Sequence, residues 1–456
     1  MLTADRVVAR LNAANDLWLR ILIASVLVEW AIGARGQCVR TFLNSCEFET
    51  HSLLSRVTGT SVAIITRYAP ESGAITARDA AALANRLATG PTAVPTVLIF
   101  GGGVYGGSVS ATESAPTPYS CVRLPERSVP RQPVLRLASS LLLGARMAVL
   151  AVRSADVIVA QTDPPLLGLW VGLLSRVVRK TWIDWTMDLY PEAFAAAGLA
   201  RHESLPMQAL RGLTRFFRAD HCIALGPRQL EYLRSTGRCG ASGSVLLCGT
   251  VAAPPPPNGG RDAPNVSAVY AGNLGEAHDA DRVAAAIQGF LAAGVPVHLA
   301  PSGKNADELL RLFRDSSNVT VGASVSHAQL ATHAFHICSL SKSWTHVAVP
   351  SKALTAVSLG RVCIFLGPSE SDTTEFVNPS GITIGPDASL SEIRDRCEAI
   401  ARAGTIEVQP ASEHADRLRA TSAEYAAESV NIVLRMAKLA AGSRTHEHTA
   451  PGVEPG

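Results

Sequence analysis

Charge is scarce in this sequence, and lysine is the scarcest charged residue. Charged residues make up 17% of the 456 positions, and aromatic residues only 5%. The 41 basic residues nearly balance the 38 acidic ones, and a formal charge of +3 is too small to predict nucleic-acid binding. A lysine inside a motif is therefore more informative than usual, and the chain has five: Lys180, Lys304, Lys342, Lys352 and Lys438.

The sequence also lacks the patterns of a metal site or a disulfide framework. None of its nine cysteines forms a CxxC pair, and an odd number of cysteines in a large chain is typical of reduced, cytosolic thiols. Three histidines lie close together but lack the HExxH spacing that puts two ligands and a base on one helical face: His327, His333 and His336. We therefore expect no metal site.

Apolar residues and length are what the chain does have. Hydrophobic residues make up 47% of the sequence. At roughly 100–200 residues per domain, the chain is long enough for two or three domains, each with its own core. A largely disordered protein is excluded by this composition.

Residues 1–60 differ from the rest and are interpreted as an N-terminal extension. The stretch from Leu17 to Ala34 is strongly apolar, but Arg20 and Glu29 interrupt it. Each buried charge costs about 2.5 kcal/mol or more at a bilayer centre, so this stretch is not expected to span a membrane. Two interpretations stay open: an interfacial or partner-binding helix, or sequence included because the gene start was set too early.

From residue 61 to 251, short β-branched runs alternate with helical stretches. The strand at Ser61–Tyr68 is followed by an Ala/Leu-rich helix that ends at Gly90, and further strands read TVLIFGG, ADVIVAQ, TWIDWTM and DHCIALG. This alternation predicts an N-terminal Rossmann-like domain, an α/β unit built on a doubly wound parallel sheet. Ligands of such sheets bind beyond the carboxyl ends of the strands.

A Pro-rich linker at 252–264 interrupts the alternation, because four consecutive prolines fit neither a helix interior nor a central strand. The alternation restarts over 265–405, which predicts a second Rossmann-like domain. A helix at 406–441 is expected to pack back across both domains, and the polar tail 442–456 is expected to be disordered. Two such domains would face each other across a cleft, the default ligand site.

A Gly-rich turn separates the first strand of the second domain from its first helix. It runs from Ala271 to His278. Glycine lets the backbone approach a phosphate closely, and the start of the following helix presents unpaired N–H groups. The turn suits a pyrophosphate, although a plain βα turn is the alternative. Its candidate ligand-binding residues are Gly272, Asn273, Leu274, Gly275 and His278.

A second motif, Pro350-Ser351-Lys352, opens a helix that is followed by the strand RVCIFLG. Ser351 is expected to be the N-cap, which puts Lys352 in a first turn where the helix dipole disfavours a cation. A lysine in that position indicates an anionic partner, unless its side chain simply points into solvent. Lys304, which also follows a strand, is a second candidate of the same kind.

Polar residues also follow two strands of the first domain. Gly73, in the loop after the first strand, is expected to approach a sugar or a phosphate. The segment from Trp182 to Glu192 ends in groups that hydrogen-bond hydroxyls or stack on sugar faces, namely Asp188, Tyr190 and Glu192. The alternative is an ordinary helix start at Pro191-Glu192.

Taken in order, these segments resemble glycosyltransferase family 4, in particular the surface-polysaccharide branch similar to colanic acid glycosyltransferases. The segments are VAIITRYAPESGAITAR, ADVIVAQTDPPLLGL, W-x-x-D-L-Y-P-E, YAGNLGEAHD and VPSKALTAVSLGRVCIFLG. The resemblance covers about Ser61 to Ala401. It implies a GT-B fold, with a nucleotide sugar held mainly by the C-terminal domain and the acceptor by the N-terminal one. It also implies an inner-membrane, polyprenyl-diphosphate-linked acceptor, for which the apolar helix Val134–Val152 is either a docking surface or a core helix.

One feature departs from the family. Many members carry two glutamates eight residues apart, the second of which binds the ribose. The matching positions here are Val347 and Thr355, neither of which is acidic. Glu375 is the nearest substitute for the ribose contact.

The resulting hypothesis is a cytoplasmic glycosyltransferase of the hexosyltransferase type, peripheral at the inner face of the cell membrane. It would need no metal and no cofactor, would use Lys352 and Asp188 in catalysis, and would retain the anomeric configuration. Its partners would be a nucleoside diphosphate sugar and a saccharide or lipid-linked acceptor. Two alternatives remain: a nucleotide-sugar epimerase of the same architecture, and a catalytically silent nucleotide-sugar-binding partner in a polysaccharide assembly complex.

Overall fold

The computed structural model describes residues 60–72, 74–103, 117–124, 133–240, 242–249, 265–322, 325–403 and 408–447. Residues 1–59 of the extension, Gly73 and the linker 252–264 lie outside the described residues.

Seven parallel strands form the first sheet, in the order β3-β2-β1-β4-β5-β6-β7. Strands β1 and β4 pair at the centre and are almost wholly buried, which explains why their sequences are continuously apolar rather than alternating. The strands are β1 (Val62–Tyr68), β2 (Thr96–Gly103), β3 (Ser120–Leu124), β4 (Val157–Gln161), β5 (Thr181–Trp185), β6 (His221–Ala224) and β7 (Gly243–Val245).

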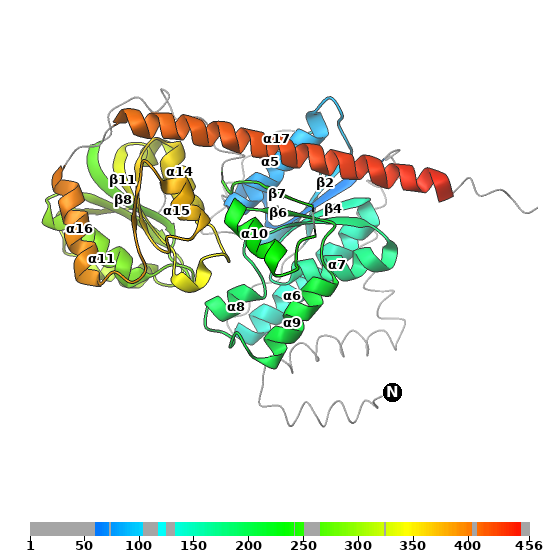
Figure 1. Cartoon of the computed structure of the whole chain (residues 1–456), viewed down its shortest axis with the longest axis horizontal. Coiled ribbons are helices and arrows are strands. Elements are labelled where there is room, and N and C mark those ends of the chain that lie inside the picture. The colour runs from blue at the N-terminus through cyan, green and yellow to red at the C-terminus, as the bar shows by residue number, and fades with distance from the viewer. Residues whose placement is uncertain are drawn as a thin grey trace, which may run out of the picture.

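Helices connect these parallel strands and cover both faces of the sheet (Figure 1). Two successive parallel strands must be joined by a crossover connection, and in this domain the crossover usually contains a helix. They are η1 (Pro70–Ser72), α5 (Ile75–Thr89), α6 (Pro133–Ser154), α7 (Leu167–Val178), α8 (Glu192–Ala196), α9 (Leu205–Phe216) and α10 (Pro227–Ser235).

Helix α6 is an apolar core helix. Its window Leu137–Ser154 is the one stretch among the described residues that is long and apolar enough to cross a membrane, but half of it is buried inside the protein. Met147, Ala148 and Ala151 are fully buried in the core of the first domain. The helix therefore fits the core interpretation of Val134–Val152 better than the docking one.

The second sheet has six parallel strands in the order β10-β9-β8-β11-β12-β13. They are β8 (Asn265–Asn273), β9 (Val297–Ser302), β10 (Val319–Val321), β11 (His333–Ser339), β12 (Val362–Leu366) and β13 (Ile382–Ile384). The helices of this domain are α11 (Ala280–Ala292), α12 (Ala306–Leu312), α13 (His327–Leu330), η3 (Lys342–Trp344), α14 (Ser351–Ser358), α15 (Asp372–Val377) and α16 (Leu390–Ala403).

The last helix, α17 (Val408–Glu447), runs back across both domains (Figure 1). It packs on α14 of the second domain and on β7, α5 and β4 of the first. Its docking on the first domain includes a buried pair of hydroxyls, Ser244 and Ser429, 3.3 Å apart. The helix continues to Glu447, past the expected end at 441 and into the tail 442–456. Residues 448–456 lie outside the described residues.

The two domains share an apolar interface. The loop between β11 and α14 contributes Trp344, Val347 and Val349 to a hydrophobic cluster that combines core residues of both domains, and each of the three is less than a tenth exposed. The backbone N–H of Leu189 donates to the carbonyl oxygen of Val347 across the boundary, at 2.9 Å. The carboxyl ends of the two sheets are thereby held close together.

Candidate functional site

The candidate site lies where the carboxyl ends of the parallel strands of the two domains meet. The second domain contributes the ends of β8, β9 and β11 and the start of α14. The first domain contributes the ends of β1, β4 and β5. In open α/β sheets this is the end at which ligands bind.

Lys352 lies at the start of α14, and within the described residues it makes no ion pair with a carboxylate. Its Nζ donates to the hydroxyl of Tyr270, at 3.0 Å, and to the carbonyl oxygen of Asn273, at 2.7 Å, and it lies 4.5 Å from the centroid of the Tyr270 ring. All of these partners are neutral. Burial lowers the pKa of the Lys352 ammonium to about 8, a shift that a nearby carboxylate would have opposed. A half-buried ammonium with only neutral partners is suited to an anionic ligand.

The start of α14 adds N–H donors beside this lysine. The N-cap is Pro350 and no side chain caps the helix, so the expectation that Ser351 would be the N-cap is wrong. Ser351 is instead the first helical residue, and the N-cap side chain makes no capping hydrogen bond. Of the first-turn N–H groups, that of Ala353 already donates to the carbonyl oxygen of Pro350, at 3.1 Å, which leaves those of Ser351 and Lys352 as the candidates for a ligand. An anion at this end would meet both the helix N–H groups and Lys352.

His278 is held as a neutral acceptor next to Lys352. Its Nδ1 lies 2.5 Å from the carbonyl oxygen of Ser339, and because a carbonyl only accepts, Nδ1 carries the proton. Burial, followed by the positive charge of Lys352, lowers the pKa of His278 to about 3. The ring is therefore neutral at physiological pH, with the lone pair of Nε2 left to accept a hydrogen bond.

The Gly-rich turn and the loop after β9 are packed together by Asn273. Gly303 has a φ of +90°, and a Cβ there would lie 2.1 Å from Oδ1 of Asn273, so both the conformation and the contact require glycine. Gly272 also has a positive φ, +93°. Leu274 is fully buried, and its N–H donates to the carbonyl oxygen of Ser302. Leu274 thus positions the turn through packing.

Lys304 is placed differently from Lys352. Its ammonium is paired with Glu276 at 2.9 Å, and its side chain is 68% exposed. A surface ion pair of this kind is weak, so an incoming phosphate could displace Glu276. Its donor-binding role stays a prediction.

Val347 and Thr355 occupy the positions at which many family members carry glutamates. Neither side chain is acidic, so neither can supply the carboxylate. The hydroxyl of Thr355 donates to the carbonyl oxygen of Ser351 within α14, at 3.0 Å. Val347 is buried in the domain interface. The carboxylate of Glu375 is paired with Arg228 of the first domain at 3.0 Å. Its ribose-binding role stays a prediction, and that ion pair would have to open for it.

In the first domain, Asp188 stands close to a second acid. The backbone N–H groups of Met187 and Asp188 both donate to the hydroxyl of Thr162, at 3.1 and 2.9 Å, which fixes the turn after β5. Burial, followed by the negative charge of Asp163, raises the pKa of Asp188 to about 7. Asp163 itself is paired with Arg67 at 3.3 Å. A carboxyl group with a pKa near 7 is suited to hydrogen-bond or take a proton from a hydroxyl.

Tyr190 and Glu192 follow Asp188 but lie in different surroundings. Tyr190 packs edge-on against Phe194, and burial raises the pKa of its hydroxyl. Glu192 is only 5% exposed, and its two oxygens contact Arg211, at 3.5 Å, and Arg238, at 2.7 Å. The structure therefore gives Glu192 a buried structural ion pair. Its proposed contact with an acceptor stays a prediction for which this carboxylate is poorly placed.

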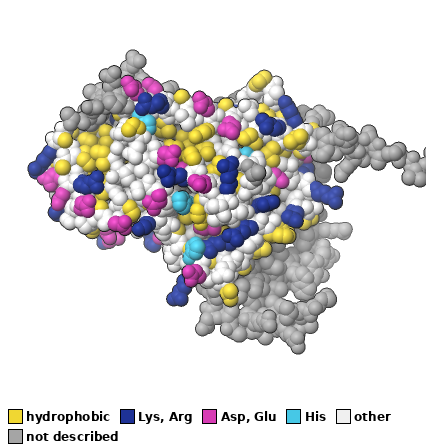
Figure 2. All heavy atoms as spheres, in the orientation of Figure 1, with side chains coloured by type: hydrophobic (Ala, Val, Ile, Leu, Met, Phe, Trp, Pro, Cys, Tyr) yellow, Lys and Arg dark blue, Asp and Glu magenta, His cyan; other side chains and the backbone are white. Residues whose placement is uncertain are grey.

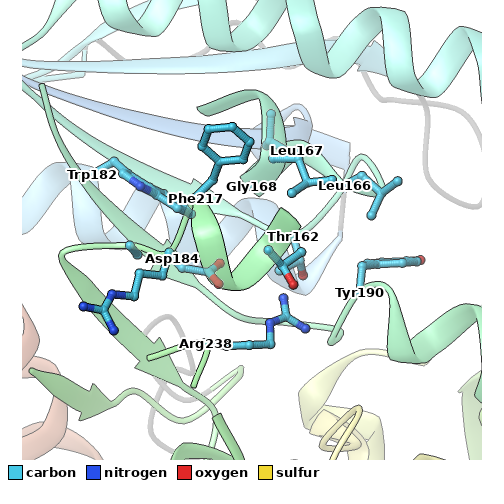
Figure 3. A pocket seen from close by; sticks show the side chains of 13 residues that line it. Thr162, Leu166, Leu167, Gly168, Trp182, Asp184, Tyr190, Phe217 and Arg238 are labelled. Carbon is cyan, nitrogen blue, oxygen red and sulfur yellow. The ribbon is translucent and has the colours of Figure 1, made fainter. Parts of the chain in front are cut away.

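A pocket lies directly behind this turn (Figure 3). It is a small hollow, partly open to solvent, between β5, α7 and the end of α9. The polar ends of Thr162, Asp184 and Arg238 point toward one another at its floor, and apolar side chains including Leu167 and Phe217 lie on the opposite side. Because Thr162 also holds the N–H of Asp188, the pocket and the candidate acceptor carboxyl share a wall.

Sequence reasoning missed several of these residues. Asp163 and Arg67 come at the ends of β4 and β1, so the rule that ligands meet strand ends could have found them. Tyr270, Thr162 and Ser339 gave no local signal, because their roles depend on which strands neighbour each other. Among the described residues, no three His, Cys, Asp or Glu side chains gather as a metal site.

The sequence matches no protein-family model and no curated protein. Its structure is similar to sucrose-phosphate synthase from Thermosynechococcus elongatus, with a TM-score of 0.57 and 13% identity over 86% of this chain and 100% of that one. It is also similar to WaaG, a glycosyltransferase involved in lipopolysaccharide biosynthesis, with a TM-score of 0.54 and 14% identity over 82% and 99%. These similarities, together with the two parallel-sheet domains, confirm the predicted GT-B fold.

Proposed function

We propose that this protein is a glycosyltransferase that moves a sugar from a nucleoside diphosphate sugar to a saccharide or polyprenyl-diphosphate-linked acceptor. The observation that carries the proposal is Lys352, a half-buried cation at a helix start without a side-chain cap, whose partners among the described residues are all neutral. The Gly272–Gly275 turn contacts Lys352 through the carbonyl oxygen of Asn273. The GT-B fold and the similarity to WaaG support sugar transfer, and the family 4 resemblance supports a role in surface polysaccharide synthesis.

The donor would lie with its diphosphate on Lys352 and the start of α14. As the bond between the anomeric carbon and the diphosphate oxygen breaks, negative charge grows on the leaving group. Lys352 and the helix N–H groups would stabilise that charge in place of a metal ion. The neutral His278 would accept a hydrogen bond from a hydroxyl of the sugar or ribose through Nε2.

The acceptor would approach from the side of the first domain. Asp188 would accept the hydrogen bond of the attacking hydroxyl and orient its oxygen toward the anomeric carbon. The new bond forms between that oxygen and the anomeric carbon as the bond from the anomeric carbon to the diphosphate oxygen breaks, and the hydroxyl proton passes to the Asp188 carboxylate. We assign retention of configuration on the family 4 resemblance, with attack and departure on one face of the sugar. No cofactor is needed for this reaction, and the reduced cysteines and the nucleotide-sugar donor fit the cytoplasm.

A second candidate is a catalytically silent nucleotide-sugar-binding partner. It is favoured by Thr355, whose hydroxyl is used within α14 where a catalytic relative has an acid. Such a protein would keep the anion site and bind donors without turning them over.

Release of free nucleoside diphosphate distinguishes the two. The full chain is incubated with a panel of nucleotide sugars, with and without membrane lipid extract. Acceptor-dependent release that is lost in Lys352→Ala and kept in Lys438→Ala, an exposed lysine of α17, supports the transferase. Binding of a nucleotide sugar without release under any condition supports the silent partner. Absence of both binding and release contradicts the proposal.

A further inference from the structure

Two cysteine thiols lie against each other behind helix α10. Cys222 belongs to β6 and is fully buried, and Cys239 follows α10 and is 5% exposed. Sγ of Cys222 lies 3.8 Å from the carbonyl oxygen of Arg238, the residue before Cys239. The Cys222 thiol donates a hydrogen bond to the sulfur of Cys239. The two sulfur atoms are therefore neighbours, although a whole helix separates the cysteines in the sequence.

A glycine of the neighbouring strand leaves room for this pair. Gly243 of β7 is paired with Cys222 in the parallel register, so both positions face the same side of the sheet. A Cβ on Gly243 would lie 3.1 Å from Sγ of Cys239 and 2.6 Å from Cδ1 of Leu230 in α10. Glycine at this position lets α10 and Cys239 pack directly over the strand pair.

Cys239 is the more acidic thiol of the pair. The hydrogen bond from Cys222 lowers the pKa of Cys239 against the opposing effect of burial, and the positive charge of Arg234 lowers it further. The same hydrogen bond, followed by burial, raises the pKa of Cys222. The other five cysteines that the structure describes all have a raised pKa: Cys121, Cys248, Cys338, Cys363 and Cys397. Because the thiolate is the reactive form, Cys239 is the described cysteine best suited to attack an oxidant.

The small hollow of Figure 3 reaches the same face of the sheet. Asp184 lines the hollow, and it is paired in register with Cys222, so their side chains lie on one side of the sheet. Arg238, which precedes Cys239, lines the hollow as well. The hollow is partly open to solvent, and hydrogen peroxide, which is close to water in size, needs only a narrow path.

We propose that Cys222 and Cys239 form a modification site, which small hydroperoxides oxidise to a reversible disulfide. The Cys239 thiolate attacks one peroxide oxygen, the O–O bond breaks, and hydroxide leaves, which produces a sulfenic acid on Cys239. Cys222 then attacks that sulfur, the S–S bond forms, and the sulfenic oxygen leaves as water with the Cys222 proton. In total, two thiols and one hydrogen peroxide give one disulfide and two waters, and the two electrons lost by the sulfur atoms reduce the peroxide. This site does not depend on the proposed sugar transfer.

The disulfide would close a loop around α10, a helix that contacts the second domain. Arg228 at its start pairs with Glu375 at 3.0 Å, and the Tyr232 ring stacks on the ring of His346 at 5.1 Å. Figure 2 shows basic and acidic side chains beside one another on the face over this helix. Closing such a loop restricts the unfolded chain, so the oxidised protein is expected to unfold at a temperature a few degrees higher than the reduced one.

Peptide mapping of the full chain tests the proposal. The reduced protein is treated with hydrogen peroxide, its remaining thiols are blocked with N-ethylmaleimide, and it is digested without a reductant. Mass spectrometry should find the peptide of Cys222 linked to that of Cys239, and dithiothreitol should separate them. Cys121→Ser is the control, because it removes an exposed thiol and should leave this link unchanged. Absence of the link in peroxide-treated wild type overturns the proposal, as does an unchanged unfolding temperature of the linked protein.

Trapping of the sulfenic acid with dimedone tests which thiol attacks. Cys222→Ser removes the second thiol but keeps a hydroxyl that can donate to Cys239, so a dimedone adduct should accumulate on Cys239. The matched variant Cys239→Ser should give no adduct on Cys222. An adduct on Cys222 in place of Cys239 overturns the assigned order of attack. The mapping of wild type does not require either variant to fold.

Discussion

Gly226 and Asp372 approach each other across the domain boundary so closely that no side chain fits on Gly226. A Cβ at that position would lie 2.3 Å from Cγ of Asp372. The Asp372 carboxylate accepts hydrogen bonds from the backbone N–H groups of Arg228 and Gln229, both at 2.8 Å. These are first-turn donors of α10, so a carboxylate of the second domain caps a helix of the first. The arrangement of the two domains is therefore fixed by a specific polar contact as well as by apolar packing.

Gly226→Ala should weaken this contact. The added methyl group pushes Asp372 away from the start of α10, and we expect a loss of about 1–3 kcal/mol in the free energy of unfolding. Chemical denaturation measures it. Gly212→Ala is the control, because a Cβ there meets nothing within 4 Å. An unchanged stability in Gly226→Ala would show that the domains do not hold this arrangement in solution.

Glu192→Ala should destabilise the protein rather than weaken acceptor binding. The substitution leaves the buried Arg238 and the largely buried Arg211 without their carboxylate, and breaking such a pair costs about 3–5 kcal/mol. The exposed Glu231 on α10 provides the control substitution, Glu231→Ala. If Glu192→Ala unfolds at the normal temperature but has a raised KM for the acceptor, Glu192 binds the acceptor rather than stabilising the fold.

Asp79 should make stability depend on pH. Its side chain is fully buried in α5, and Oδ2 accepts from the N–H of Gly249 at 2.7 Å while Oδ1 has no partner. Burial raises its pKa from 3.8 to about 7. The folded state thus holds the proton more tightly than the unfolded one, so its stabilising contribution is complete below about pH 4 and is lost as the pH rises toward 7.

Asp79→Asn removes this dependence. Relative to the variant, wild type should lose stability between pH 4 and 7 with a slope of at most about 1.4 kcal/mol per pH unit. Denaturation of both proteins across that range measures the difference. A difference that does not change with pH contradicts the assignment.

Asp188 should set the acid side of the pH–rate profile. Its pKa is about 7, raised by burial and then by Asp163, so the fraction of ionised carboxylate increases through that pH. The value of kcat/KM for the acceptor should therefore rise with pH and level off above about 7. Asp163→Asn should shift this rise to lower pH because it removes the neighbouring charge. If Asp163→Asn does not shift the pH–rate profile, the group that titrates is not Asp188.

The local patterns of this sequence predicted the fold well. The strands β1, β2, β4 and β12 and the helix α5 agree with the expected segments to within a few residues, because each combines a continuous apolar run with a clear boundary such as Gly90. The edge strand β3 and the short helix α15 were not expected, whereas α8 begins at Glu192 and agrees with the alternative of a helix start at Pro191-Glu192. Both β3 and α15 are held by contacts with neighbouring elements, which no local pattern reveals.

The parts of the candidate site that the sequence suggested are those marked by residue types that are informative by themselves, namely a glycine-rich turn and one of the few lysines. Lys352 and the Gly272–Gly275 turn come together as the strand-end rule requires. The partners that set their chemistry, Tyr270 and Ser339, are ordinary strand residues in sequence. For Glu192 the sequence was misleading. A carboxylate after a strand suggested a contact with a ligand, but its partners are arginines that lie 19 and 46 residues farther along the chain, where no local pattern connects them to it.

The central claim is that Lys352 and the start of α14 bind the diphosphate of a nucleotide sugar, and calorimetric titration of UDP, GDP and ADP tests it most directly. A charge-assisted contact of about 1.5–3 kcal/mol corresponds to a roughly 10- to 150-fold change in affinity. We expect Lys352→Ala to lose affinity by that factor for whichever nucleotide binds, and Lys438→Ala to match wild type. Binding by Lys352→Ala with the affinity of wild type would contradict the account.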